Sequence, residues 1–267
     1  MPYATASEVR VYYEIHGDGP ALVFCHGSGG NHAIWWQQIA HFRDRYRVIA
    51  VDFPGFGNSN SEPEAWDAHR YPDAIEAVLD DAAADRVVLV GQSLGCAPAL
   101  AVAVRHPERI AGVVMAHSTG GIADDQLEAQ VRADRLEADK LSVLDRLLSR
   151  RFQAEDPAKV ALFREIGTFN RATPSTVRNN RQWPTTVTDV KRAIGAGVFV
   201  CFLQGTADAV VRPASYELLR RLLPEAHVES VEGAPHSLYW EAPDVFNGVL
   251  DHILERAVPA ATSAPTI

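Results

Sequence analysis

Residues 87–95 carry the sequence Val-Val-Leu-Val-Gly-Gln-Ser-Leu-Gly, and this stretch decides both the expected fold and the expected chemistry. The run at 87–90 is typical of a strand buried on both faces, and a segment with helical spacing, 94–106, follows it directly. A serine in a sharp turn between a strand and a helix has a strained backbone, and glycines two residues before and after it remove side chains that would collide. The spacing therefore predicts that Ser93 is a nucleophile rather than an ordinary turn serine.

The same turn supplies a backbone donor for the oxyanion that forms when a nucleophile attacks a carbonyl. Leu94 opens the predicted helix, so its N–H and the positive end of the helix dipole would face the developing charge. The glycine-rich loop 27–30 follows an apolar run, and we expect the N–H of Ser28 to be the second donor. This loop lacks both the GxGxxG and the GxxxxGK[ST] spacing, so phosphate binding is not expected.

Other stretches extend this alternation of strand and helix along the chain. Near the start, apolar and polar residues alternate at 9–15, and a Gly-rich turn leads into the apolar run 21–25, which predicts an antiparallel hairpin that opens the sheet. Further strand-like runs lie at 47–51, 110–115, 198–203 and 226–231, and helical spacing recurs at 35–42, 72–82, 216–223 and 243–253. The predicted fold class is α/β, with a mostly parallel, open, twisted sheet and helices on both of its faces.

A long interval between the strand-like runs at 110–115 and 198–203 interrupts this alternation. A structureless loop of that length is improbable, and apolar residues recur there at helical spacing with prolines between the sets. We expect a helical cap at 121–189, inserted into a core domain made of residues 1–120 and 190–256. The segment 257–267 is small, contains proline and has no period, so a disordered tail is expected.

A serine nucleophile needs a base and a carboxylate, and both can be chosen by their positions in the chain. His236 lies in a loop between the strand-like run 226–231 and the last helix, where ligands bind in open α/β sheets. Asp208 follows the run 198–203 and would reach the same sheet edge, where it can fix the imidazole tautomer. His117 follows another strand but nothing orients it as a base, whereas His26 is expected to hold its loop by hydrogen bonds.

Charge and composition exclude several other classes of protein. The 25 Lys and Arg residues against 34 Asp and Glu give a net charge of −9, and no stretch concentrates positive charge, so nucleic acid is not an expected partner. The apolar run at 97–104 spans eight residues, well short of the ~18 that a membrane-spanning helix requires. No secretory signal is evident, so a cytoplasmic location is expected. The 3 cysteines are isolated, and neither a disulfide framework nor a metal site is expected.

Five motifs in chain order carry a family resemblance: His26-Gly27, Asp52-Phe-Pro-Gly-Phe-Gly-Asn-Ser59, the 91–95 turn, Gly205-Thr-Ala-Asp-Ala-Val-Val211, and the Val-Val-Arg-Pro sequence at 210–213. Together they resemble the α/β-hydrolase superfamily, in particular its small serine hydrolases with a helical cap. The resemblance implies an oxyanion loop at 26–30, a sheet-edge turn formed with the help of Asp52, and a triad in the order Ser93, Asp208, His236. It also implies that no metal or organic cofactor takes part.

Two positions in the sequence narrow the choice among the branches of this superfamily. A serine at 93 argues against haloalkane dehalogenases and epoxide hydrolases, which use aspartate there. Carbon–carbon hydrolases tend to carry tryptophan after the catalytic histidine, where this chain has Ser237. We therefore expect a serine esterase that forms an acyl-enzyme, with a carbon–carbon or lactone hydrolase using the same triad as the alternative. A ligand receptor on a hydrolase scaffold is a third hypothesis.

The expected ligand is a small-molecule substrate, and dimerisation through the cap stays open. The residues expected to line the substrate site are Gly27, Gly29, Trp35, His117, Trp183 and Tyr239.

Overall fold

Within the residues that the computed structural model describes, 2–59, 61–179 and 184–258, eight strands form one sheet in the order β1-β2-β4-β3-β5-β6-β7-β8. From β4 to β8 every neighbouring pair is parallel, whereas β2 is antiparallel to β4 and β1 is antiparallel to β2. The strands are Tyr3–Ala6 (β1), Val9–His16 (β2), Ala21–Cys25 (β3), Arg47–Val51 (β4), Val87–Gln92 (β5), Ile110–Ala116 (β6), Phe199–Gly205 (β7) and His227–Val231 (β8). The predicted open, mostly parallel sheet is confirmed.

The predicted hairpin of 9–15 with 21–25 is wrong, because β2 and β3 are not neighbours. β3 lies between β4 and β5, and β2 pairs with β4, with Tyr13 opposite Val51. Every residue of β3 is buried, which suits a central strand, whereas β2 carries the exposed Arg10 and suits a place near the edge. Gly17 and Gly19 have φ values of +76° and +121°, and this turn lets the chain cross to the far side of β4.

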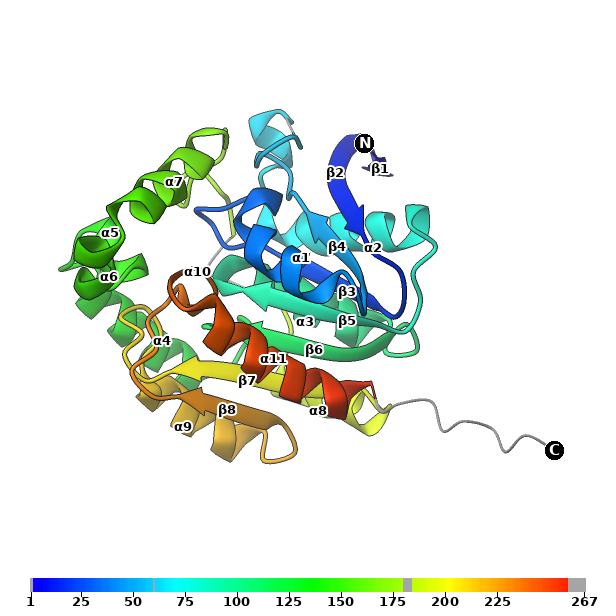
Figure 1. Ribbon diagram of the computed structural model, residues 1–267. Coiled ribbons are helices and arrows are strands. Elements are labelled where there is room, and N and C mark those ends of the chain that lie inside the picture. Colours follow the sequence, from blue (N-terminus) through cyan, green and yellow to red (C-terminus); the bar gives the residue numbers. More distant parts are fainter. Residues whose placement is uncertain (1, 60, 180–183, 259–267) are drawn as a thin grey trace.

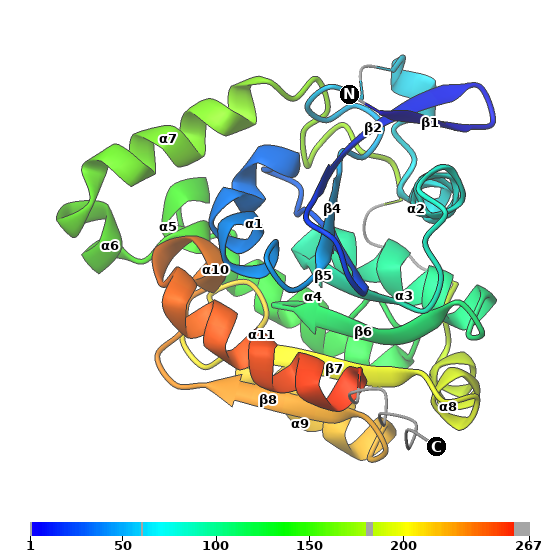
Figure 2. The ribbon, with the colours of Figure 1, turned by 45° about the vertical axis from the view of Figure 1, so that its right-hand side comes forward.

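Helices cover both faces of the sheet, as predicted (Figures 1 and 2). On one face lie α1 (Trp36–Phe42) and α11 (Pro243–Ala257), which share a hydrophobic core with β3 and β5. On the other lie α2 (Tyr71–Asp81), α3 (Cys96–Arg105) and α9 (Pro213–Leu222), which form a second core. In the described ranges, no helix combines the length and apolarity that crossing a bilayer requires.

The segment expected to form the cap carries α4 (Asp125–Ala138), α5 (Val143–Leu147), α6 (Arg150–Glu155) and α7 (Pro157–Thr168), which lie beyond the carboxyl ends of the central strands (Figure 1). Each of these helices is preceded by an N-cap residue whose side chain accepts a backbone N–H of the first turn: Asp124, Ser142, Ser149 and Asp156. α8 (Val187–Gly195) crosses the expected boundary at 189/190 and packs against α3. α11 extends to Ala257, and residues 259–267 of the expected tail lie outside the described residues.

The backbone at Ser93 adopts a constrained conformation at the sheet edge. β5 passes into the short 3-10 turn η4 (Ser93–Gly95) and then into α3, and Ser93 has a φ of +49°, in the left-handed region. A Cβ on Gly91 would lie 2.6 Å from the Cα of Cys96, and a Cβ on Gly95 would lie 2.3 Å from the carbonyl oxygen of Cys25. Different neighbours therefore require the two glycines. A side chain at 91 would collide with the turn itself, and a side chain at 95 would collide with the end of β3.

The loop that joins β3 to the 3-10 turn η1 (His32–Trp35) is fixed at its start by a buried imidazole. The N–H of Phe53 donates to Nε2 of His26 at 3.1 Å, so the ring proton is on Nδ1, which donates to the carbonyl of Gly27 at 2.8 Å. The ring is fully buried, and this burial lowers the pKa of His26 to about 4. His26 therefore holds the loop by hydrogen bonds in its neutral form, as expected from the sequence.

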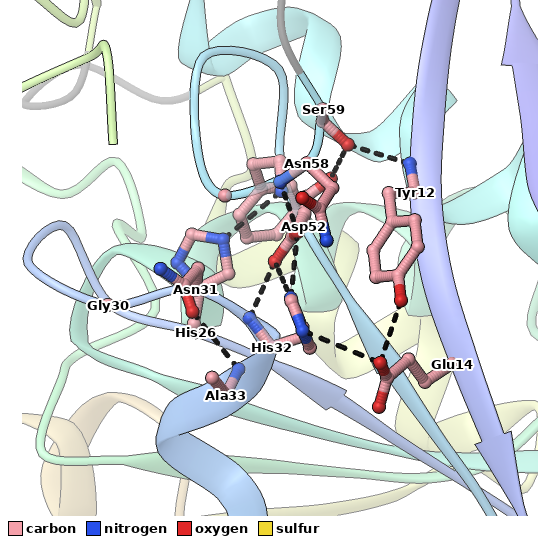
Figure 3. A network of polar contacts seen from close by, with 12 residues as sticks. Tyr12, Glu14, His26, Gly30, Asn31, His32, Ala33, Asp52, Asn58 and Ser59 are labelled. Atoms are coloured by element: carbon pink, nitrogen blue, oxygen red, sulfur yellow. Dashed lines mark hydrogen bonds and ion pairs between the residues drawn. The ribbon is translucent and has the colours of Figure 1, made fainter. Parts of the chain in front are cut away.

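A second polar network fixes the same loop at its end (Figure 3). Oδ1 of the buried Asp52 accepts the backbone N–H of His32 at 2.5 Å, and the imidazole of His32 donates to Oδ2 at 2.8 Å. Oδ2 also accepts the N–H of Asn58 at 2.8 Å, which closes the turn that the resemblance assigned to Asp52. The loop between β3 and η1 is thus bound to the end of β4 from both sides.

We predict that Gly95→Ala lowers the free energy of unfolding by about 3 kcal/mol, because the new methyl group would meet backbone atoms that have no free rotation. The matched control is Gly248→Ala in α11, where nothing lies within 4 Å of the added Cβ. This control should gain about 0.5–1 kcal/mol, since alanine is the better helix former. Urea unfolding of both variants checks this, and equal changes would contradict it.

We predict that His26 makes stability fall with acidification. Folded His26 stays neutral down to its pKa of about 4, whereas the unfolded side chain takes a proton near its ordinary value of 6.5. Between these values the unfolded chain binds more protons, so the stability contribution is complete above pH 6.5 and is lost as the pH falls.

From about pH 7 to about pH 5 this loss amounts to about 2 kcal/mol. In His26→Gln the titration is absent, so urea unfolding should show a pH dependence that is flatter by that amount. Parallel curves for the variant and the wild type would show that His26 does not titrate in this way.

Candidate functional site

Three predicted site residues lie at the carboxyl edge of the sheet, each carried by a different loop. Ser93 opens the turn after β5, Asp208 follows β7, and His236 follows β8. Ser93 is partly exposed, whereas Asp208 and His236 are buried. Ser93 is therefore accessible from outside the sheet edge, whereas the other two residues are shielded from solvent.

Asp208 and His236 form a direct hydrogen-bonded pair. Nδ1 of His236 lies 2.9 Å from Oδ2 and 3.0 Å from Oδ1 of Asp208, so the imidazole proton is on Nδ1 and Nε2 is left as an acceptor. The backbone N–H groups of Val210 and Val211 donate to Oδ1 at 2.7 and 3.1 Å, which fixes the carboxylate in its own loop. An imidazole whose tautomer and orientation are set in this way by a buried acid can accept a proton at Nε2.

Gln92 ties the His236 loop to the turn that carries Ser93. Its Nε2 donates to the carbonyl oxygen of His236 at 3.2 Å, and Gln92 directly precedes Ser93 in the chain. Reasoning from the sequence missed this residue, because it occupies a variable position of the G-x-S-x-G motif. A Cβ on Gly27 would lie 2.1 Å from its Oε1, so the glycine at 27 leaves space for this link.

His117 lies beside the acid rather than only at the edge of a pocket. Its Nδ1 is 3.3 Å from Oδ2 of Asp208, its ring centroid is 5.9 Å from that of His236, and its φ is +59°. Its Nε2 is buried and has no partner within the part of the chain that the structure describes. Burial lowers the pKa of His117, so the ring is neutral near neutral pH and donates through Nδ1.

The carboxylate form of Asp208 is stabilised by these two rings. Burial alone would raise the pKa of Asp208, but the electrostatic interaction with His236 and the hydrogen bonds from both imidazoles lower it well below its usual range. Asp208 therefore stays ionised at any pH at which the protein would work.

The loop between β3 and η1 holds the peptide that carries the Ser28 N–H. The carbonyl of Gly27 accepts both the His26 Nδ1–H at 2.8 Å and the Gly30 N–H at 3.1 Å. Because the peptide unit is planar, these two bonds also fix the direction of the Ser28 N–H. Ser28 is partly exposed and Gly29 is exposed, while Leu94 is the second residue of η4, where helical N–H groups have no partner in the helix.

Two of the three aromatic residues expected to line the substrate site lie within the described residues. Trp35 and Tyr239 are buried in the core between the sheet and α11, with their ring centroids 4.9 Å apart. Trp183 lies outside the described residues. The structure thus gives Trp35 and Tyr239 packing partners in the core.

Two further features have the donor atoms or the space of a ligand site. His117, Asp208 and His236 place ligand atoms within 4.8 Å of one another, but a metal ion there would have to displace both Nδ1–H donors from the carboxylate. A hollow of about 420 Å³ lies at the amino ends of β3 and β4, lined by Arg47 and Asp85 among others, at the opposite edge from Ser93. The first feature is the Asp208–His236 pair already described, with His117 beside it, and the second lies away from that pair.

Comparisons with known proteins agree with this architecture. The 2-(acetamidomethylene)succinate hydrolase of Mesorhizobium japonicum is 26% identical over 243 residues, which cover 86% of each chain. The 3-oxoadipate enol-lactonase 2 of Acinetobacter baylyi is 32% identical over 124 residues, 46% of each chain. The structure of the enol-lactonase from Burkholderia xenovorans LB400 superimposes with a TM-score of 0.76 at 21% identity, over 95% of this chain and 99% of that one.

The family comparison covers most of the chain. The model of the alpha/beta hydrolase family matches residues 22–249, from β3 to α11, and so includes the Ser93 turn and the loops of Asp208 and His236. With this match on a sheet of this strand order, the chain belongs to the alpha/beta hydrolase family.

Proposed function

We propose that the protein is a serine hydrolase that cleaves a small-molecule carboxylic ester through an acyl-enzyme. The observation that carries the proposal is the buried Asp208–His236 pair. Gln92, next to Ser93 in the chain, donates a hydrogen bond to the loop of His236. The strained φ of Ser93 supports the same assignment, because such strain is kept where function requires it.

The proposed reaction has two halves. Oγ of Ser93 attacks the acyl carbon while Nε2 of His236 takes the hydroxyl proton, and the Ser28 and Leu94 N–H groups stabilise the resulting oxyanion. The tetrahedral intermediate then expels the alcohol, which leaves with the proton from His236. A water molecule, deprotonated by the same imidazole, attacks the acyl-enzyme and releases the acid and Ser93.

Asp208 takes no proton in this scheme. Its carboxylate, held by the N–H groups of Val210 and Val211, stabilises the imidazolium that His236 becomes in each half-reaction. His117 donates to Oδ2 of the same carboxylate, whereas the Val210 and Val211 N–H groups donate to Oδ1.

The proposed bond type draws on the nucleophile and on two of the relatives. The M. japonicum relative is named for hydrolysis of an acetamidomethylene succinate and the A. baylyi relative for an enol-lactone. A lactone is a cyclic ester, so the same acyl transfer serves an enol-lactone and an open-chain ester alike. An open-chain ester is the simplest substrate for this machinery, and lactones and carbon–carbon substrates belong in the same assay panel.

We predict hydrolysis of p-nitrophenyl esters with an optimum at one acyl length, measured with a series from acetate to decanoate. Ser93→Ala should lose this activity by a factor of about 10⁶, because it removes the group that forms the acyl-enzyme. A burst of p-nitrophenol equal to the enzyme concentration should precede the steady state if deacylation is slow.

The panel also separates the alternatives. Cleavage of a lactone or a carbon–carbon substrate, with no ester cleaved at any length, would replace the ester assignment while keeping Ser93. Activity that survives Ser93→Ala would contradict the proposed mechanism for every substrate class. A single turnover followed by arrest would support the receptor hypothesis instead.

A further inference from the structure

Asn170 joins the inserted helices to two loops of the core. It follows the end of α7 and is partly buried. Its Nδ2 donates to the carbonyls of Gly30 at 3.1 Å and Gly29 at 3.4 Å, and its Oδ1 accepts the Gly57 N–H at 3.0 Å and the Asn31 Nδ2–H at 3.1 Å. One side chain thus binds the loop after β3 and the turn after β4 at once.

This set of contacts requires an amide. An asparagine side chain has two N–H donors and an oxygen with two lone pairs, and Asn170 uses all of them. A carboxylate would keep the two accepting bonds but would place negative charge against two carbonyl oxygens. The two sides of Asn170 can therefore be tested separately.

The backbone around Asn170 also contacts the loop after β3 and the turn after β4. The carbonyl of Gly55 accepts the N–H groups of Arg171 and Ala172 at 2.9 and 2.7 Å, and Nδ2 of the buried Asn31 donates to the carbonyl of Ile166 at 2.9 Å. Gly167 lies so close that an added Cβ would be 3.1 Å from the carbonyl of Gly29. The end of α7 is therefore packed onto the loop and is not merely tethered to it.

These bonds lead directly to the proposed oxyanion donor. The Gly29 carbonyl, held by Asn170, shares its peptide plane with the Gly30 N–H, which donates to the carbonyl of Gly27. The Gly27 carbonyl in turn shares its peptide plane with the Ser28 N–H. Two rigid peptide units therefore connect Asn170 to Ser28.

We propose that Asn170 is a positioning residue through which the inserted helices set the direction of the Ser28 N–H. The inference rests on the proposed function, in which Ser28 stabilises the oxyanion. Because the donors for an oxyanion must be placed before charge develops, a displaced loop weakens binding of the transition state more than binding of the substrate. A substrate that moves α7 would thereby change the rate of acyl transfer.

The test compares Asn170→Asp and Asn170→Ala with the wild type on the best p-nitrophenyl ester. Asn170→Asp should lower kcat about tenfold or more with KM changed less than about twofold, since only the transition state needs the oriented donor. The affinity for a trifluoromethyl ketone of matching acyl length, which forms a tetrahedral oxyanion on Ser93, should fall by the same factor. Asn170→Ala should show the same split.

The control is Asn179→Gly. Asn179 also lies in the inserted segment, and its Nδ2 donates to Oδ1 and Oδ2 of Asp67 in the core at 3.1 and 3.0 Å, bonds that the substitution removes. Glycine tolerates the φ of +54° at that position. The kcat of Asn179→Gly and its affinity for the inhibitor should match those of the wild type. Wild-type kinetics in Asn170→Asp, or an equal loss in Asn179→Gly, would overturn the inference.

Hydrogen exchange of the peptide covering 27–32 gives a readout that needs no substrate. Exchange in folded Asn170→Asp should be faster than in the wild type, while the rest of the sheet keeps its protection. If the wild type cleaves no ester, the proposed function fails, and faster exchange would still show that Asn170 holds the loop. Unchanged exchange would overturn the positioning role whatever the activity.

Discussion

The left-handed backbone at Ser93 is the constraint on which the rest of the site depends. With a φ of +49°, the chain turns from β5 into α3 within three residues, so the hydroxyl stands at the sheet edge and the first helical N–H groups lie next to it. This turn is possible only if Gly91 clears the Cys96 backbone and Gly95 lets β3 come close. The loop after β3 can then lie beside Ser93.

Once β3 and β5 are adjacent, hydrogen bonds between the loops that follow neighbouring strands position the remaining groups of the site. His26 and Asp52 fix the two ends of the loop after β3, Gln92 holds the His236 loop, and Asp208 orients the imidazole. These side chains are all buried, where unmade hydrogen bonds are costly, so each link favours a single arrangement. The inserted helices join this network at Asn170.

Local patterns in the sequence were sufficient to predict the strands from β3 to β8, the turn at Ser93, and the pair of Asp208 and His236 as candidates at one edge. Each of these depends on neighbours in the chain or on the rule that parallel strands end at the same side. The partner of β2 could not be predicted, because a Gly-rich turn permits a crossing as readily as a hairpin. His117, Gln92 and Asn170 act through contacts over long separations in sequence, and the packing of Trp35 against Tyr239 in the core has the same origin.

The central claim is that Ser93, strained at the end of β5, is the reacting group. The most direct measurement is labelling with a dialkyl p-nitrophenyl phosphate, followed by mass spectrometry of the intact protein and of its peptides. The account predicts one phosphoryl group per chain, located on the peptide that contains Ser93, with release of one equivalent of p-nitrophenol. Absence of an adduct on the folded protein, or an adduct on another residue, would contradict it.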